Sequence, residues 1–215
     1  MRYLISGGGT GGHINPGIAI AKEILSREPD ADILFVGTKH GLESKLVPRE
    51  GFPIEYIEVS GFKRKLTADT LKTVVRLVKS FGAIKKIIKE FRPDAVIGTG
   101  GYVCGPVVFS ATLKKIPTLI HEQNAFPGVT NKILSHFVDS VAISFEESRA
   151  RFKGKAKVTL TSNPVRGELF SIDRTEARKK LELDPNKPLV VVFGGSLGAE
   201  HLNQCVAEAA PKYDD

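Results

Sequence analysis

Short apolar runs alternate with amphipathic segments along most of the chain. Runs rich in Val, Ile and Leu predict strands near residues 2–6, 32–36, 54–59, 94–98, 117–121, 139–143 and 157–160. Apolar positions at helical spacing predict helices near residues 16–28, 40–47, 67–91, 103–114 and 128–137. This alternation is typical of an α/β fold with a doubly wound parallel sheet, in which ligands bind at the carboxyl ends of the strands.

The alternation starts again after Asn163. A helical pattern over residues 173–183 leads into the apolar run 189–193, and the glycine-rich segment 194–199 follows. This order of strand, glycine turn and helix indicates a second Rossmann-like domain. We therefore expect an N-terminal domain over residues 1–162 and the beginning of another over residues 163–215, too short to close a sheet of its own.

A glycine-rich loop separates the first predicted strand from the first predicted helix and reads Ser6-Gly7-Gly8-Gly9-Thr10-Gly11-Gly12-His13. Glycine lets the backbone approach a ligand closely, and a helix start offers unpaired N–H groups to an anion. We expect Asn15 to cap that helix and Pro16 to be its first residue. A phosphate, pyrophosphate or sugar is the ligand that such a loop favours.

Two common classes of phosphate-binding protein fit this loop poorly. The spacing Gly7-x-Gly9-x-x-Gly12 matches the dinucleotide fingerprint, but the second predicted strand ends without the carboxylate that would bind a ribose. A nucleoside triphosphatase loop needs a lysine after its last glycine, where this chain has His13. These differences argue against a nicotinamide-dependent dehydrogenase and against a P-loop enzyme.

Composition describes an ordinary globular protein with a basic balance. The 215 residues are 41% hydrophobic and 26% charged, with a net charge of +7. We expect neither a membrane-spanning segment nor a signal peptide, because no apolar run is long enough and no charged leader precedes one. Two cysteines far apart, Cys104 and Cys205, predict a reducing compartment without a disulfide framework.

The positive charge is concentrated between residues 63 and 92, a segment that contains ten basic residues and two acidic ones. Apolar residues at helical spacing accompany them, so the segment predicts one basic amphipathic helix or two that break near Gly82. Such a helix suits an anionic membrane surface, although a core helix with a solvated face shows the same pattern. Nucleic acid is a poorer partner, because the chain lacks tryptophan and interleaved aromatic residues. The residues that we assign to the membrane surface are Lys72, Arg76, Lys79 and Phe81.

Three more glycine-rich or polar clusters follow predicted strands. Each alone is explained equally well as a turn or as a set of structural hydrogen bonds. Together with the first loop they would meet at one edge of a parallel sheet, which indicates a binding site. The clusters are Gly98-Thr99-Gly100-Gly101-Tyr102, His121-Glu122-Gln123-Asn124 and Asn163-Pro164-Val165-Arg166.

These motifs, with Gly194-Gly195-Ser196-Leu197-Gly198-Ala199, carry a resemblance that runs from Met1 to about Ala210. In order and spacing they resemble the bacterial cell-wall glycosyltransferases that add N-acetylglucosamine to undecaprenyl-pyrophosphoryl-N-acetylmuramoyl-pentapeptide. The resemblance implies a glycosyltransferase B fold with an N-terminal acceptor domain and a C-terminal domain for UDP-N-acetylglucosamine. It also implies a peripheral protein on the cytoplasmic face of the bacterial membrane.

The resemblance assigns roles to individual residues. Positions that contact the sugar nucleotide are matched by Thr10, Gly11, Gly12, Asn124, Arg166 and Ser196. Loops that cradle the acceptor pyrophosphate are matched by Gly8, Gly9, Gly100, Gly101 and Tyr102. Ser162 stands where the family pattern has glycine. Most of the family's second domain would lie after Asp215, so we expect an incomplete form whose own activity is impaired.

The implied reaction is an inverting displacement at the anomeric carbon of the donor by the muramoyl 4-hydroxyl. His13 is our first candidate for the general base, and Glu122 is the second. We expect no cofactor and no metal, since no paired acidic motif is available to hold one. Two alternatives stay open: a sugar-nucleotide transferase subunit that works with a separate donor-binding chain, and a noncatalytic module that binds a membrane surface.

Overall fold

The computed structural model describes residues 1–59, 68–195 and 198–213. The chain divides into two units, Met1–Gly167 and Glu168–Asp215, and each is described here by itself. The predicted boundary at residue 162 lies close to this division. The assignment of the two parts to acceptor and donor stays a prediction.

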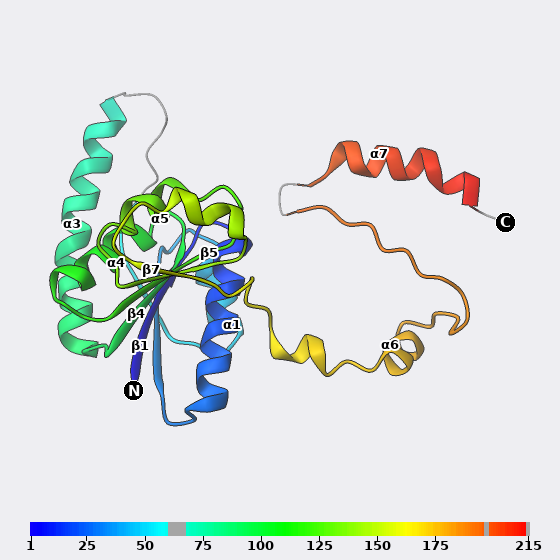
Figure 1. The fold of residues 1–215 in the computed structure, drawn as a ribbon, viewed down its shortest axis with the longest axis horizontal. Helices are drawn as coiled ribbons and strands as arrows, with labels where there is room; N and C mark the ends of the chain where they lie inside the picture. The colour runs from blue at the N-terminus through cyan, green and yellow to red at the C-terminus, as the bar shows by residue number, and fades with distance from the viewer. Residues whose placement is uncertain (60–67, 196–197, 214–215) are drawn as a thin grey trace. The chain divides into compact units, whose positions relative to one another are not determined.

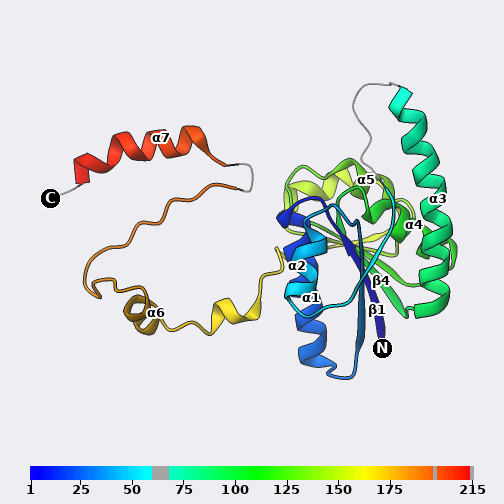
Figure 2. The same ribbon diagram turned by 180° about the vertical axis from the view of Figure 1, so that it is seen from behind.

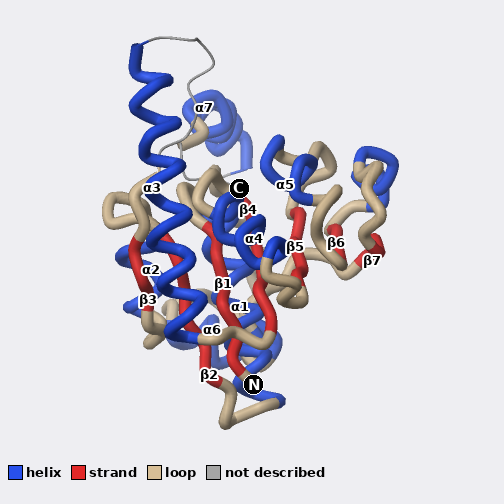
Figure 3. The backbone as a smooth tube through the Cα atoms, turned by 90° about the vertical axis from the view of Figure 1, so that its left-hand side faces the viewer, coloured by secondary structure: helices blue, strands red, loops and turns tan. Residues whose placement is uncertain are grey.

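The first unit is built on a seven-stranded sheet with the order β3-β2-β1-β4-β5-β6-β7 (Figure 3). All of its strand pairs are parallel. The predicted doubly wound α/β fold is confirmed. The order reverses between β1 and β4, which makes the carboxyl ends of these two strands the switch point where such folds bind ligands. The strands are β1 (Arg2–Gly7), β2 (Asp32–Gly37), β3 (Ile54–Tyr56), β4 (Ala95–Gly100), β5 (Thr118–Glu122), β6 (Ser140–Ile143) and β7 (Lys157–Leu160).

Helices cover both faces of this sheet, as Figures 1 and 2 show for α1 and α3. On one face, α3, α4 and α5 pack on alternate strand residues such as Leu4 and Val96. On the other, α1 and α2 pack on their neighbours Ile5 and Ile97. Side chains of adjacent strand residues thus fill opposite cores, as the strand periodicity requires. The elements are α1 (Gly11–Arg27), α2 (Glu43–Arg49), α3 (Ala68–Phe91), α4 (Cys104–Leu113), α5 (Val129–Leu134) and the 3₁₀ helix η1 (Glu146–Arg151).

The start of α1 differs from the prediction. Thr10, not Asn15, is the N-cap residue, and Pro16 lies inside the helix instead of beginning it. The Thr10 carbonyl accepts from the backbone N–H of His13 at 3.1 Å and of Ile14 at 3.2 Å, which closes the first turn earlier. The second half of the glycine loop is therefore helical.

The basic segment forms a single helix, α3, which passes through Gly82 without a break. The prediction of a helix over residues 67–91 is confirmed for residues 68–91. The preceding basic residues Lys63, Arg64 and Lys65 lie outside the described residues.

The second unit contains α6 (Arg174–Lys180), α7 (Glu200–Ala209) and a final 3₁₀ turn, η3 (Ala210–Tyr213). Another 3₁₀ turn, η2 (Gly167–Phe170), begins at the division between the units. Asp173 caps α6 by accepting from the Glu176 N–H at 2.9 Å. The strand predicted over residues 189–193 is wrong, because no strand pairs with this segment within the described residues and an isolated strand leaves its backbone unsatisfied.

Candidate active site

Two glycine loops meet at the carboxyl ends of β1 and β4. The Gly8 N–H donates to the Gly100 carbonyl at 3.3 Å. Gly101 lies so close that a Cβ added to it would stand 2.3 Å from the Gly8 oxygen. Gly9, Gly100 and Gly101 have φ values of +86°, +105° and +83°, a region that favours glycine. Several glycines that the sequence assigned to ligand contact therefore also let one loop pack directly on the other.

His13 lies at this junction, in the first turn of α1. Its Nδ1 is 3.0 Å from the Gly8 carbonyl oxygen, and its ring occupies the space that a Cβ on Gly100 would need. Because a carbonyl only accepts, the neutral ring carries its proton on Nδ1 and keeps a lone pair on Nε2. The half-buried imidazole is thus oriented to accept a proton through Nε2.

Glu122, the second candidate base, is almost fully buried at 1% exposure at the end of β5. One oxygen accepts from the backbone N–H and the side-chain amide of Asn124, at 3.0 and 2.9 Å. The other accepts from the Gly128 N–H at 3.1 Å and from the Asn131 amide at 2.9 Å. With four donors on its carboxylate, Glu122 holds Asn124 in place and is poorly arranged to take a proton from a substrate.

His121 and Gln123 join β5 to β4. The Gln123 amide donates to the Thr99 carbonyl at 2.8 Å and lies 3.0 Å from His121 Nδ1. His121 Nε2 is 3.1 Å from the carbonyl of Ser162, whose φ is +61°. Burial lowers the pKa of His121 below its usual value, and the Ser162 carbonyl and Glu122 oppose that shift. His121 is therefore a neutral structural bridge between β5 and Ser162.

Sequence analysis missed two residues of the site, Glu43 and Asn131. We expected no carboxylate near the end of β2, yet α2 brings Glu43 there, where it accepts from the Thr38 N–H at 3.0 Å and from the Gly9 N–H at 3.1 Å. Both residues lie on short helices and make contacts distant in sequence. A polar residue at a buried helical position was the only signal that could have found them.

Arg166, predicted to contact the donor, lies 3.7 Å from Glu50 through its Nη1 atom. The other oxygen of Glu50 is 2.7 Å from the Lys22 ammonium, whose hydrogen bond lowers the pKa of Glu50. About half of the Arg166 side chain is exposed, so its guanidinium also faces solvent. Ser196, the remaining predicted donor contact, lies outside the described residues.

The residues assigned to a membrane surface have different surroundings. Lys79 is exposed, while Phe81 is half-buried with its ring edge-on to Phe109. The side chains of Lys72 and Arg76 lie outside the described part of the chain. No helix in the described ranges is long and apolar enough to cross a bilayer.

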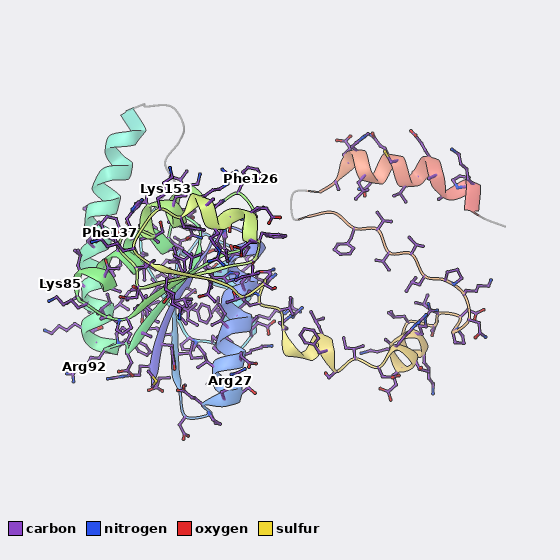
Figure 4. All side chains as sticks on the ribbon, in the orientation of Figure 1. Arg27, Lys85, Arg92, Phe126, Phe137 and Lys153 are labelled. Carbon is purple, nitrogen blue, oxygen red and sulfur yellow. The ribbon has the colours of Figure 1, made fainter. Side chains whose placement is uncertain are left out.

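Exposed apolar side chains that sequence analysis missed lie on α5 and on the segments before and after it. Figure 4 labels Phe126, Phe137 and Lys153 at the surface of the first unit, and Arg151 stacks over the Phe126 ring at 4.3 Å. We define the α5 patch by its exposed side chains, which are Phe126, Val129, Lys132, Ile133 and Phe137.

Among the described residues, no group of three or more His, Cys, Asp or Glu side chains is placed to hold a metal ion. The groups that the site presents are the imidazole lone pair, the backbone N–H groups in the first turn of α1 and the Arg166 guanidinium. Such groups suit proton transfer and the binding of phosphate oxygens.

Comparisons with known proteins show to which family the chain belongs. Residues 3–143 match the glycosyltransferase family 28 N-terminal domain. The UDP-N-acetylglucosamine--N-acetylmuramyl-(pentapeptide) pyrophosphoryl-undecaprenol N-acetylglucosamine transferase of Acetivibrio thermocellus is 61% identical over 99% of this chain and 58% of its own length. The enzyme of the same name from Bacillus pumilus is 53% identical over 97% of this chain and 57% of its own.

Solved structures show the same fold. The crystal structure of Acinetobacter baumannii MurG has a TM-score of 0.71 and 32% identity, covering 99% of this chain and 58% of that one. A UDP-GlcNAc 2-epimerase from Neisseria meningitidis has a TM-score of 0.62 at 14% identity, over 99% of this chain and 63% of that one, which is a likeness of fold alone. The chain spans about 58% of the length of the first of these relatives. It belongs to glycosyltransferase family 28, and its first unit is the N-terminal domain of that family.

Proposed function

We propose that this chain is the acceptor-binding part of an enzyme that transfers N-acetylglucosamine from UDP-N-acetylglucosamine to the muramoyl 4-hydroxyl of undecaprenyl-pyrophosphoryl-N-acetylmuramoyl-pentapeptide. The observation that carries the proposal is the junction of the two glycine loops with the His13 imidazole where β1 and β4 end. The names of the relatives, which are 61% and 53% identical, support this reaction over other sugar-nucleotide chemistry.

The acceptor pyrophosphate is proposed to lie against the two glycine loops. The Gly8 and Gly9 N–H groups donate to Gly100 and Glu43, so these glycines contribute loop shape more than free donors. The amides of Gly11 and Gly12 belong to the first turn of α1, where a helix has no internal acceptors for them. These two amides and the positive end of the helix dipole are therefore assigned to the diphosphate of the donor, while the two glycine loops are assigned to the acceptor pyrophosphate.

The donor is proposed to contact Thr10 and the first turn of α1, Asn124, Arg166 and Ser196. Glu122 acts here through Asn124, which it fixes with two hydrogen bonds. The Arg166 guanidinium is suited to the UDP diphosphate, since arginine binds phosphate oxygens through paired N–H groups. Residues 163–215 would then begin the donor domain.

The transfer step uses the Nε2 atom of His13, on which the Nδ1–H tautomer leaves the lone pair. The muramoyl 4-oxygen forms a bond to the anomeric carbon as the bond from that carbon to the diphosphate breaks. UDP leaves with the bonding electron pair, and the anomeric configuration inverts. His13 Nε2 takes the proton of the hydroxyl, a role that typically contributes 10²–10⁴-fold to the rate.

A transfer assay tests the reaction. The chain, joined to a complete family C-terminal domain, is supplied with UDP-N-acetylglucosamine and the lipid-linked acceptor, and the disaccharide product is measured by mass spectrometry. His13→Ala should lower kcat by about 100-fold or more while the folded state survives. Near-normal turnover of His13→Ala would remove the histidine from proton transfer, and no product from the unmodified protein would contradict the proposed reaction.

Peripheral binding at the cytoplasmic face of the membrane is the second part of the proposal. The α5 patch lies on the face of the sheet that α3 covers and combines exposed apolar side chains with Lys132. The exposed basic residues of α3 include Lys79 and Lys86, of which Lys86 lies 3.9 Å from Glu90. Each basic residue near an anionic surface contributes about 1 kcal/mol.

Cosedimentation with vesicles tests this part. Lys79→Glu combined with Lys132→Glu should abolish binding to anionic vesicles. A matched control, Lys45→Glu with Arg49→Glu, changes the charge equally on α2 at the opposite face and should bind normally. Equal binding by both double variants would contradict the assignment, and binding without any transfer activity would favour the noncatalytic alternative.

A further inference from the structure

Glu43 occupies a space that three glycines leave open. A Cβ on Gly8 would lie 2.8 Å from the Glu43 carboxyl carbon, one on Gly37 would lie 2.5 Å from its Cγ, and one on Gly41 would lie 2.2 Å from Oε2. The side chain itself is 0% exposed. The glycines at these positions therefore make room for a carboxylate inside the protein.

The donors to this buried carboxylate within the described part of the chain are all neutral groups. Oε1 accepts from the Thr38 N–H at 3.0 Å and the Thr38 hydroxyl at 2.7 Å, and Oε2 accepts from the Gly9 N–H at 3.1 Å. No lysine, arginine or histidine forms an ion pair with Glu43 within the described ranges. Burying a charge without a countercharge costs stability, whereas an apolar side chain at this position would avoid that cost. A function other than packing is the better explanation for the carboxylate.

One peptide group connects Glu43 to His13. The Gly9 N–H that donates to Glu43 and the Gly8 carbonyl that faces His13 Nδ1 at 3.0 Å belong to the same peptide unit. A trans peptide directs its N–H and its carbonyl to opposite sides, so the carboxylate binds one end and the imidazole the other. Hydrogen bonds in such a chain polarise one another, which strengthens the bond at His13.

We propose that Glu43 is a positioning residue for His13 and acts through the Gly8–Gly9 peptide. It fixes the orientation of that peptide, and the carbonyl then keeps the imidazole proton on Nδ1 and the lone pair on Nε2. Its role corresponds to that of the carboxylate which orients the histidine in a Ser-His-Asp triad, with a peptide group inserted between them. The catalytic meaning of this arrangement rests on the proposed function of His13.

Glu43→Gln tests the link selectively. The glutamine carbonyl oxygen can still accept from Thr38, but its NH₂ group then faces the Gly9 N–H, donor against donor. Asp139→Asn is a matched control, because the Asp139 carboxylate accepts from the Thr118 N–H at 2.8 Å and from the Thr118 hydroxyl at 2.9 Å. Thr118 lies at the beginning of β5, whereas the candidate site lies where the strands end. In both variants an amide replaces a carboxylate that accepts hydrogen bonds from a threonine. Only Glu43→Gln also changes the contact with the Gly8–Gly9 peptide.

The first measurement is made by NMR on the 215-residue chain. In the unmodified chain the Gly9 amide should be protected from exchange, and the His13 imidazole ¹⁵N shifts should show the Nδ1–H tautomer. Glu43→Gln should speed Gly9 exchange by about tenfold or more and give mixed His13 tautomers, while Asp139→Asn should change neither. Unchanged Gly9 exchange and an unchanged tautomer in Glu43→Gln would overturn the proposal.

Two further results keep the test decisive. If Glu43→Gln does not fold, the unmodified chain decides, because an Nε2–H tautomer or an unprotected Gly9 amide there would overturn the link. In the enzyme with a complete second domain, Glu43→Gln should lower kcat by about tenfold or more with little change in the KM for UDP-N-acetylglucosamine. A failure of all transfer would contradict the proposed function, whereas the exchange and tautomer results would still test the positioning role.

Discussion

Alanine at Gly101 and alanine at Gly12 should change the stability of the first unit in opposite directions. Gly101 has a φ of +83°, and an added Cβ would lie 2.3 Å from the Gly8 oxygen. Gly8 cannot move away freely, because its N–H and its carbonyl are both hydrogen bonded. Gly12 lies in α1, and the nearest atom to its added Cβ is the Thr10 hydroxyl at 3.7 Å, an ordinary contact.

The magnitudes follow from these two environments. A left-handed conformation costs alanine about 1–2 kcal/mol, and the overlap with Gly8 adds about 1–3 kcal/mol, so Gly101→Ala should lose about 3 kcal/mol. Gly12→Ala should gain about 0.5 kcal/mol, because alanine favours the helix and restricts the unfolded chain. For a unit of this size each kcal/mol shifts Tm by about 2–4 °C, which predicts a fall of about 6–12 °C and a rise of about 1–2 °C.

Gly51 separates the two contributions at Gly101. Its φ is +84°, and no atom lies within 4 Å of an added Cβ. Gly51→Ala should therefore lose only the conformational part, about 1–2 kcal/mol. Thermal unfolding followed by circular dichroism compares the three variants. If Gly101→Ala were no less stable than Gly51→Ala, the backbone contact between the loops would be refuted, and a destabilised Gly12→Ala would refute the early start of α1.

Three more predictions concern the network around β5. Ser162→Gly should raise Tm, with a gain of up to about 1 kcal/mol, because glycine adopts a φ of +61° without strain. Since burial lowers the pKa of His121 below 6.5, the unfolded chain binds a proton at this residue before the folded chain does as the pH falls. Stability should therefore decrease below about pH 6.5 and level off below the lowered native pKa. His121→Gln should flatten that part of a Tm-against-pH curve. Asn131→Ala should cost about 2–3 kcal/mol in a urea titration, because Glu122 and the His121 carbonyl both lose a buried donor; a loss under about 0.5 kcal/mol would contradict the network.

The sequence predicted the layers of the fold and the edge that carries the site, because both depend on the periodicity of apolar residues. It also placed the glycine loops and His13 together, since they follow neighbouring parallel strands. It misplaced the start of α1, because Pro16 usually marks a first helical residue and here lies inside the helix.

The pattern also assigned the glycines, Gly101 among them, to a ligand surface, so that alanine there would be expected to impair binding. The structure shows that this glycine packs on Gly8, so the stability loss should be large as well. Glu43 could not be found in this way, because its partners Thr38 and Gly9 are revealed only when α2 folds back on two strand ends. Periodicity reports which face of an element is buried, but it does not report which buried polar groups meet.

The apolar segment 189–193 has a practical consequence for anyone who purifies this chain. Val190 and Phe193 are 83% and 81% exposed, and a run of β-branched and aromatic residues with an unpaired backbone is a template for joining copies into intermolecular sheets. Lys187 and Pro188, residue types that oppose such pairing, flank this segment on its N-terminal side only. Preparations should therefore scatter light above a threshold concentration set by this segment, and Val191→Lys should raise that threshold without altering the melting of the folded sheet.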